Sequence, residues 1–224
     1  MKILAVDTSA VCASVAVTEN GKILSESSIN TGLTHSRTLM PMIDSVLKNG
    51  EITLDGIDLF AYSVGPGSFT GIRIGVAAIK GLCDAISKKC VPVSTLEALA
   101  YNLTGRKCTA VSVMDARCNQ VYCGIFSING EEVTRLTDDM AIKIDELGEM
   151  IKSYSDIIFV GDGAKICHNA LGYEKAPANC EYQKGSSVSF VAEKNADKAV
   201  DSKELLPVYL RLPQAERELK AKQK

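Results

Sequence analysis

One order of elements occurs twice in this chain, and that repeat constrains the fold most strongly. In the first copy, residues 2–7 form an apolar run that ends on an aspartate. The strand-like runs 13–18 and 22–27 follow, separated by an Asn-Gly pair at 20–21. Such a pair between two strands predicts a hairpin, because a type I′ turn needs positive φ at both central residues. The sequence therefore begins with a predicted three-strand meander.

The second copy begins near residue 109. Residues 109–115 again end on an aspartate, and the runs 120–126 and 131–136 flank a second Asn-Gly pair at 129–130. Two copies of one element order predict two related half-domains.

Helices and strands alternate after each meander. The patterns predict helices at 34–48, 69–87, 95–103 and 145–152, and strands at 59–64, 91–93 and 156–160. We expect Thr34 to cap the first helix and Pro41 to kink or shorten it. This repeated order is typical of the α/β actin-like ATPase (ASKHA) fold, with two ribonuclease-H-like half-domains and mixed sheets. We place the half-domains at residues 1–104 and 105–224, with the C-terminal segment packing back on the fold.

Composition excludes several classes of protein. The formal net charge of the 224 residues is -2 and the basic cluster is confined to 217–224, so we do not expect this chain to bind nucleic acid by itself. No run of about 18 apolar residues could span a bilayer, and the first strand leaves no room for a secretory signal. We therefore expect a cytoplasmic protein with no membrane partner. The 8 cysteines include no C-x-x-C pair and are expected to be reduced core residues.

The segment Gly65-Pro66-Gly67 follows a predicted strand and opens a helix, where anions commonly bind. Its spacing matches neither phosphate fingerprint. Gly71 comes one residue too late for G-x-G-x-x-G, and Arg73 does not supply the ending of a P-loop. A tight turn that lets backbone segments pack closely is the alternative interpretation.

Two aspartates end the first strands of the two copies, Asp7 and Asp115. In actin-like kinases the turns at these places bind phosphates, and the carboxylates can act together only if both halves close on one cleft. The alternative is that each aspartate caps its own turn. The candidate cofactor-binding residues, treated as vestigial nucleotide-type loops, are Asp7, Thr8, Ser9, Gly65 and Gly67.

No catalytic or metal-binding residue is predicted. His35 and His168 are the two histidines, and neither has a histidine four residues later. A helix-borne zinc or iron site is therefore excluded, and His35 is expected to be a surface or capping residue. No G-x-S-x-G elbow of a hydrolase is present.

The predicted helix 69–87 is apolar on most sides, and Arg73, Lys80 and Asp84 alone interrupt it. One face should pack on the sheet, and the second is predicted to meet another chain. Gly71 and Gly75 would let a neighbouring helix approach closely. The alternative is that this helix and the preceding one, 34–48, are simply core helices.

The candidate interface residues on these two helices are His35, Leu39, Met42, Ile43, Val46, Ile72, Val76, Ile79, Lys80 and Cys83. On this hypothesis, Val76→Glu or Ile79→Glu should abolish self-association and partner binding but leave a folded monomer.

Six segments, in order along nearly the whole chain, resemble the TsaB (YeaZ) family. They are residues 3–9, 35–36, 65–75, 93–100, 115–117 and 207–211. The resemblance implies the actin-like fold. It also implies membership of the complex that transfers a threonylcarbamoyl group to the adenosine beside the anticodon of tRNAs reading codons that begin with A.

The catalytic subunit of that complex, TsaD, is a paralogue with two metal-binding histidines four residues apart. Here Thr95 and Leu99 stand at those positions. The resemblance therefore implies a non-catalytic partner of TsaD, and not an enzyme. It further implies the ATPase TsaE as third member, a homodimer, contact with tRNA only through the complex, and pairing through the two helices. No cofactor is required, and ATP or ADP is expected only at a shared interface. Arg37 departs from the acidic residue common in the family and is expected to alter partner preference.

The main alternative is a small actin-like kinase or ATPase that uses Asp7, Gly65, Gly67 and Asp115 around a nucleotide. A glycoprotease, a function once attached to relatives, has no supporting metal site or nucleophile here.

Overall fold

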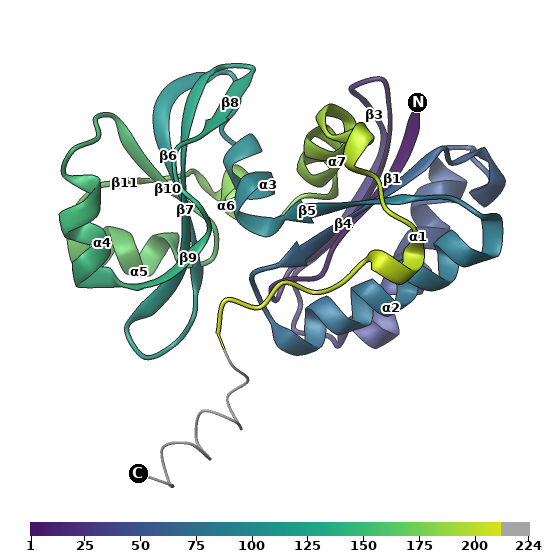
Figure 1. Cartoon of the computed structure of the whole chain (residues 1–224), viewed down its shortest axis with the longest axis horizontal. Coiled ribbons are helices and arrows are strands. Elements are labelled where there is room, and N and C mark those ends of the chain that lie inside the picture. The colour runs from purple at the N-terminus through teal and green to yellow at the C-terminus, as the bar shows by residue number, and fades with distance from the viewer. Residues whose placement is uncertain (212–224) are drawn as a thin grey trace, which may run out of the picture.

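The computed structural model describes residues 1–211, so the basic cluster 217–224 lies outside the described residues. The described chain forms two mixed sheets that stand side by side (Figure 1). The first has the order β3-β2-β1-β4-β5. β1 pairs antiparallel with β2 but parallel with β4, which gives the mixed sheet that the repeat predicts. Its strands are β1 (Lys2–Asp7), β2 (Ala13–Glu19), β3 (Lys22–Ile29), β4 (Leu59–Gly65) and β5 (Cys90–Ser94).

Helices cover both faces of the first sheet. α1 (His35–Asn49) and α2 (Phe69–Ile86) pack on one face, and α7 (Gly185–Lys194) packs on the other against β1 and β2. Thr34 precedes α1, but its side chain makes no capping hydrogen bond. Pro41 lies inside α1 without ending it. The predicted side-chain cap is thus wrong, while the predicted helix is present.

The second sheet has the order β11-β10-β6-β7-β8, with β9 paired to β7. Its strands are β6 (Arg106–Asp115), β7 (Gln120–Gly130), β8 (Glu132–Arg135), β9 (Met140–Lys143), β10 (Ile157–Val160) and β11 (Glu174–Lys175). α4 (Ile144–Ile151) and α5 (Ala164–Leu171) cover one face, and α3 (Thr95–Tyr101) packs on β6 and β7 at the other. The short helix α6 is Ala178–Glu181, and 3-10 turns lie at Leu54–Gly56, Ala196–Lys198 and Ser202–Glu204.

The two Asn-Gly turns differ. Asn20 and Gly21 have φ of 49° and 76°, as a type I′ turn requires, so the first hairpin prediction is confirmed. In the second hairpin Asn129 pairs with Glu132, and of the Asn-Gly pair only Gly130 has positive φ, at 64°. The second turn is therefore shifted by one residue along the chain.

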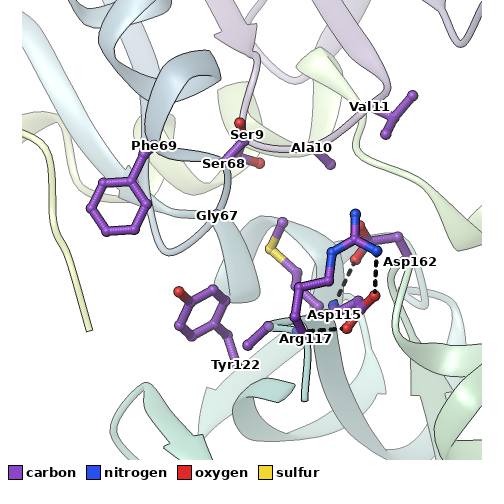
Figure 2. Close-up of a pocket in the computed structure, with 12 residues that line it drawn as sticks. Ser9, Ala10, Val11, Gly67, Ser68, Phe69, Asp115, Arg117, Tyr122 and Asp162 are labelled. Atoms are coloured by element: carbon purple, nitrogen blue, oxygen red, sulfur yellow. Dashed lines mark hydrogen bonds and ion pairs between the residues drawn. The ribbon is translucent and has the colours of Figure 1, made fainter. Parts of the chain in front are cut away.

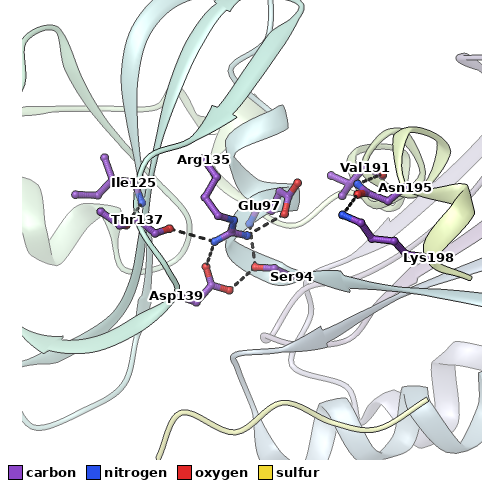
Figure 3. A network of polar contacts seen from close by, with 9 residues as sticks. All are labelled: Ser94, Glu97, Ile125, Arg135, Thr137, Asp139, Val191, Asn195 and Lys198. Carbon is purple, nitrogen blue, oxygen red and sulfur yellow. Dashed lines mark hydrogen bonds and ion pairs between the residues drawn. The ribbon is translucent and has the colours of Figure 1, made fainter. Parts of the chain in front are cut away.

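An ionic network joins α3 to the second sheet (Figure 3). Arg135 of β8 donates to Glu97 of α3 at 2.8 Å and to Asp139 at 2.5 Å. The hydroxyl of Ser94 donates to the other carboxylate oxygen of Asp139 at 2.5 Å, while its oxygen caps α3 at the N–H of Glu97. The guanidinium of Arg135 also lies 4.8 Å from the ring centre of Phe126. α3 is thereby fixed between the two sheets.

The C-terminal part of the described chain returns to the first sheet. Val200 bridges to Cys90, and the N–H of Val208 donates to the carbonyl of Val64 at 2.8 Å. The division into 1–104 and 105–224 stays a prediction; it falls in the connection between α3 and β6.

Six cysteines are buried, whereas Cys118 is exposed in the turn after β6 and Cys180 is partly buried. Cys118 is therefore not a core residue. Among the described helices, none has both the length and the apolar composition needed to cross a bilayer.

Candidate functional site

The glycines that open α2 allow two backbone segments to touch. The N–H of Ser68 donates to the carbonyl of Ser9 at 2.6 Å, and a Cβ at Gly67 would lie 2.3 Å from that oxygen. A Cβ at Gly65, where φ is 130°, would lie 2.4 Å from the carbonyl oxygen of Val208. Both positions therefore need glycine for close packing inside this chain. These contacts favour the alternative interpretation of Gly65-Pro66-Gly67, a tight turn that lets backbone segments pack closely.

The next two glycines also pack inside the chain. A Cβ at Gly71 would lie 2.0 Å from the carbonyl oxygen of Thr8, and one at Gly75 would lie 2.3 Å from the ring of Tyr62. The prediction that Gly71 and Gly75 admit a helix of another chain is wrong, since the space is already filled by β4 and the β1–β2 loop.

Asp7 and Thr8 are fully buried beneath the loop. One carboxylate oxygen of Asp7 accepts hydrogen bonds from the N–H and the hydroxyl of Ser9, at 2.8 and 2.7 Å. Burial raises the pKa of Asp7 above its ordinary value. The hydroxyl of Thr8 donates to the carbonyl of Gly71 at 2.8 Å and lies 2.8 Å from the hydroxyl of Tyr62. These contacts match the turn-capping alternative.

A groove beside these loops lies between the two halves and has a volume of about 370 Å³ (Figure 2). It brings Ser9 and Gly67 of the first half together with Asp115 of the second, so the two loops share one cleft. Asp7, Thr8 and Gly65 do not line it. The full lining is Ser9, Ala10, Val11, Gly67, Ser68, Phe69, Met114, Asp115, Ala116, Arg117, Tyr122 and Asp162.

The charged groups of the cleft come from the second half. The N–H of Asp115 donates to Asp162 at 3.3 Å, and Arg117 pairs with Asp115 at 3.6 Å. Burial raises the pKa of Asp162 to about 6, although the hydrogen bond from the N–H of Asp115 opposes the rise. Asp115 is already paired with Arg117, and the N–H of Ser68 is already bonded to Ser9. The nucleotide site therefore stays a prediction without support from the cleft chemistry.

Sequence reasoning missed Asp162. Its signal is the Gly161-Asp162-Gly163 turn directly after the buried strand β10, since ligands of α/β sheets bind beyond the carboxyl ends of the strands.

The predicted partner interface is not a surface. Eight of its residues are buried in the first core between the sheet, α1 and α2: Leu39, Met42, Ile43, Val46, Ile72, Val76, Ile79 and Cys83. His35 and Lys80 are partly exposed but bond within the chain, to the carbonyls of Ala10 at 2.7 Å and Lys203 at 3.4 Å. The correction has a physical cause: the apolar faces of α2 meet the sheet, α1 and Leu205 of the returning segment.

The helix α3 carries Thr95 and Leu99 one turn apart. Their exposed fractions are 0% and 1%, and Leu99 belongs to the second core with Met114 and Phe126. A hydroxyl and an aliphatic side chain supply no strong metal ligand. Within residues 1–211, no three histidine, cysteine or acidic side chains cluster closely enough to hold a metal ion.

Comparison with known proteins identifies the family. The family model described as TsaD, tRNA N6-adenosine threonylcarbamoyltransferase, matches residues 23–219. The tRNA threonylcarbamoyladenosine biosynthesis protein TsaB of Buchnera aphidicola subsp. Schizaphis graminum is 34% identical over 179 residues, which cover 77% of this chain and 85% of that protein.

The chain belongs to the TsaB family. The TsaB of Bacillus subtilis is 28% identical over 225 residues, covering 96% of each chain. A solved structure from Pseudomonas aeruginosa, described as similar to peptidase YEAZ, superposes with a TM-score of 0.78 at 24% identity, over 94% of this chain and 99% of that one. Together with the two mixed sheets, these matches confirm the predicted actin-like fold of the TsaB family, and they do not favour the kinase alternative.

Proposed function

We propose that this TsaB-family chain is a non-catalytic partner of TsaD in the synthesis of threonylcarbamoyladenosine in tRNA. The names of its relatives supply the pathway. The TsaD-type transferase of Brachyspira hyodysenteriae, 30% identical over 118 residues, supplies the link to the catalytic paralogue.

The observation that carries the non-catalytic role is the buried pair Thr95 and Leu99. The TsaB resemblance places the two metal-binding histidines of TsaD at these positions. Here one side chain is a fully buried hydroxyl and the other is part of the second core, packed against β6 and β7. Neither position can present a ligand to the cleft without repacking α3.

The partner surface we propose is the outer face of α1 and α2, and its occupant is TsaD. With the predicted interface residues buried, this face presents Met40, which is 47% exposed, and the exposed small residues Ala77 and Gly81. Ile74 and Ala78 beside them are partly exposed. These small and apolar residues share the exposed face of α2 with Thr70, Arg73 and Asp84. Small side chains between polar ones suit the close approach of a helix from a partner.

The remaining assignments follow from this role. TsaE is the third member of the complex, a homodimer forms through the same helix face when TsaD is absent, and the complex works in the cytoplasm. The chain requires no cofactor, and ATP or ADP binds only at an interface shared with a partner. It meets tRNA through the complex, in keeping with its formal charge of -2.

Light scattering on a mixture of this chain with the TsaD of the same organism tests the proposal. We expect the mass of a heterodimer, and we expect the modification rate of TsaD to rise when the chain is added. Separate masses for the two proteins, together with a modification rate of TsaD that does not change when this chain is added, would refute the partnership.

A further inference from the structure

The segment 205–211, here called the strap, runs along α2 and then crosses to the second half of the molecule (Figure 1). Leu205 is fully buried in the first core, and Val208 bonds to Val64 of β4. Leu206 between them is 63% exposed. The strap therefore begins as a segment anchored to the first half.

An aromatic and cationic stack fixes the middle of the strap. The ring of Tyr209 is stacked on Phe69, the first residue of α2, with ring centres 4.6 Å apart and an interplanar angle of 16°. Arg73, one turn along α2, donates from Nε to the hydroxyl of Tyr209 at 2.9 Å. Its guanidinium carbon lies 5.5 Å from the ring centre of Tyr209 and 5.9 Å from that of Phe69. Stacking, a hydrogen bond and cation–π attraction thus act on one side chain.

The end of the strap is fixed to the other half. Arg211 donates from Nη1 to the carbonyl oxygen of Ala116, in the turn after β6. Leu210 packs against the second core. Only one residue separates Tyr209 from Arg211, so the two anchors on opposite halves are joined by a very short length of backbone.

Both anchors hold walls of the cleft. Phe69 and Ala116 line it from opposite sides, Phe69 at the start of α2 and Ala116 beside Asp115. A separation of the two halves at the cleft must therefore break either the contact of Tyr209 or that of Arg211.

We propose that the strap is a latch: Tyr209 on Phe69 and Arg73, and Arg211 on Ala116, hold the cleft closed, and release of either residue lets its two walls separate. The latch is a property of the isolated chain and does not depend on TsaD.

The distance across the cleft tests this directly. Nitroxide labels are placed on the exposed native Cys118, in the turn after β6, and on Thr70→Cys, on the exposed side of α2, in a Cys180→Ser background. Double electron–electron resonance on the full chain then gives the distance distribution. We expect one narrow distance in the parent and a second, longer population in both Tyr209→Ala and Arg211→Ala. Leu206→Ala, a truncation to alanine at a strap position that is 63% exposed, is the control and keeps the parent distribution.

Hydrogen exchange of the Val208 amide reports whether the strap has been released. In Tyr209→Ala it should exchange about tenfold faster, and in Tyr209→Phe, which keeps the stack, much less so. Faster exchange at Val208 with an unchanged cleft distance would overturn the proposal, because the strap would then be only a packed tail. Unchanged exchange would overturn it as well, because the stack would not hold the strap. Arg211→Ala alters a partly exposed side chain, so it decides the question if Tyr209→Ala fails to fold.

Discussion

The ring of Tyr62 on β4 occupies the space that a side chain at Gly75 of α2 would need, since a Cβ there would lie 2.3 Å from the ring. The glycine-rich segment is thus a packing device inside the chain. It brings α2 close to the first sheet and to the loop after β1.

Substitution of two glycines on α2 separates packing from helix propensity. Gly75→Ala should destabilise the fold by about 1–3 kcal/mol, because the new methyl group overpacks against Tyr62. Gly81→Ala is the control: a Cβ there meets nothing within 4 Å, and alanine should stabilise the helix by roughly 0.5–1 kcal/mol. Urea unfolding measures both. Equal effects of the two changes would contradict the packing account.

The sequence predicts α2 almost residue by residue but not what covers it. The apolar pattern predicts a helix at 69–87, and the helix observed is Phe69–Ile86, because Ser68 caps its start and Ser87 ends it in the left-handed conformation. The apolar pattern of α2 does not distinguish between packing against another chain and packing against a distant part of the same chain. Leu205, more than a hundred residues away, supplies part of that cover.

Tertiary packing also explains the segments that local patterns missed. α7 begins Gly185-Ser186-Ser187, which are weak helix formers, and no helix was predicted there. It forms because Val188 and Val191 pack on the first sheet. In the cleft, Ser9, Gly67 and Asp115 could be predicted from strand ends, whereas Phe69 and Tyr122 could not.

Two neighbouring positions on α2 distinguish core from surface. Val76→Glu should unfold the protein, at a cost of more than about 3 kcal/mol for an unpaired buried charge. Ala77→Glu lies on the exposed face and should leave the fold intact while weakening the TsaD complex at least about tenfold, since a charge would be desolvated there.

Circular dichroism and light scattering with TsaD check this pair. Ser153→Glu, at an exposed position of the second half, is the control and should bind TsaD normally. A folded monomer from Val76→Glu would restore the original interface prediction, and full binding by Ala77→Glu would exclude this face.

Asp162 should give the stability a distinct pH dependence. Its pKa is raised to about 6 in the folded protein, so the folded state holds a proton that the unfolded state has lost. Stability from this group is therefore present at about pH 4 and is lost as the pH rises through 6. Asp162→Asn keeps an acceptor for the N–H of Asp115 and should remove this loss, which raises stability at pH 7 on the order of 2 kcal/mol.

Urea midpoints between pH 4 and 7 measure this effect. The exposed Asp138→Asn serves as control and should follow the parent curve. If the urea midpoint of Asp162→Asn shows the same pH dependence as that of the parent, the pKa of the Asp162 carboxyl is not raised in the folded protein.

Arg135 should act as a bridge between α3 and the second sheet. Arg135→Met removes its bonds to Glu97 and Asp139 and should destabilise the protein by about 1–3 kcal/mol, a value reduced from that of a fully buried pair because the side chain is 31% exposed. Arg135→Lys should recover only part of the loss, since one ammonium cannot reach both carboxylates with the same geometry. Thermal unfolding measures the series, and full recovery by lysine would contradict a two-sided bridge.

The central claim is that this chain supports the transfer reaction without a transfer site of its own. Mass spectrometry of nucleosides from tRNA incubated with a threonylcarbamoyl donor tests it most directly. We predict no threonylcarbamoyladenosine with this chain alone, slow formation with TsaD alone, and a markedly faster rate when both are present with TsaE. Formation of the modified nucleoside by this chain alone would contradict the account.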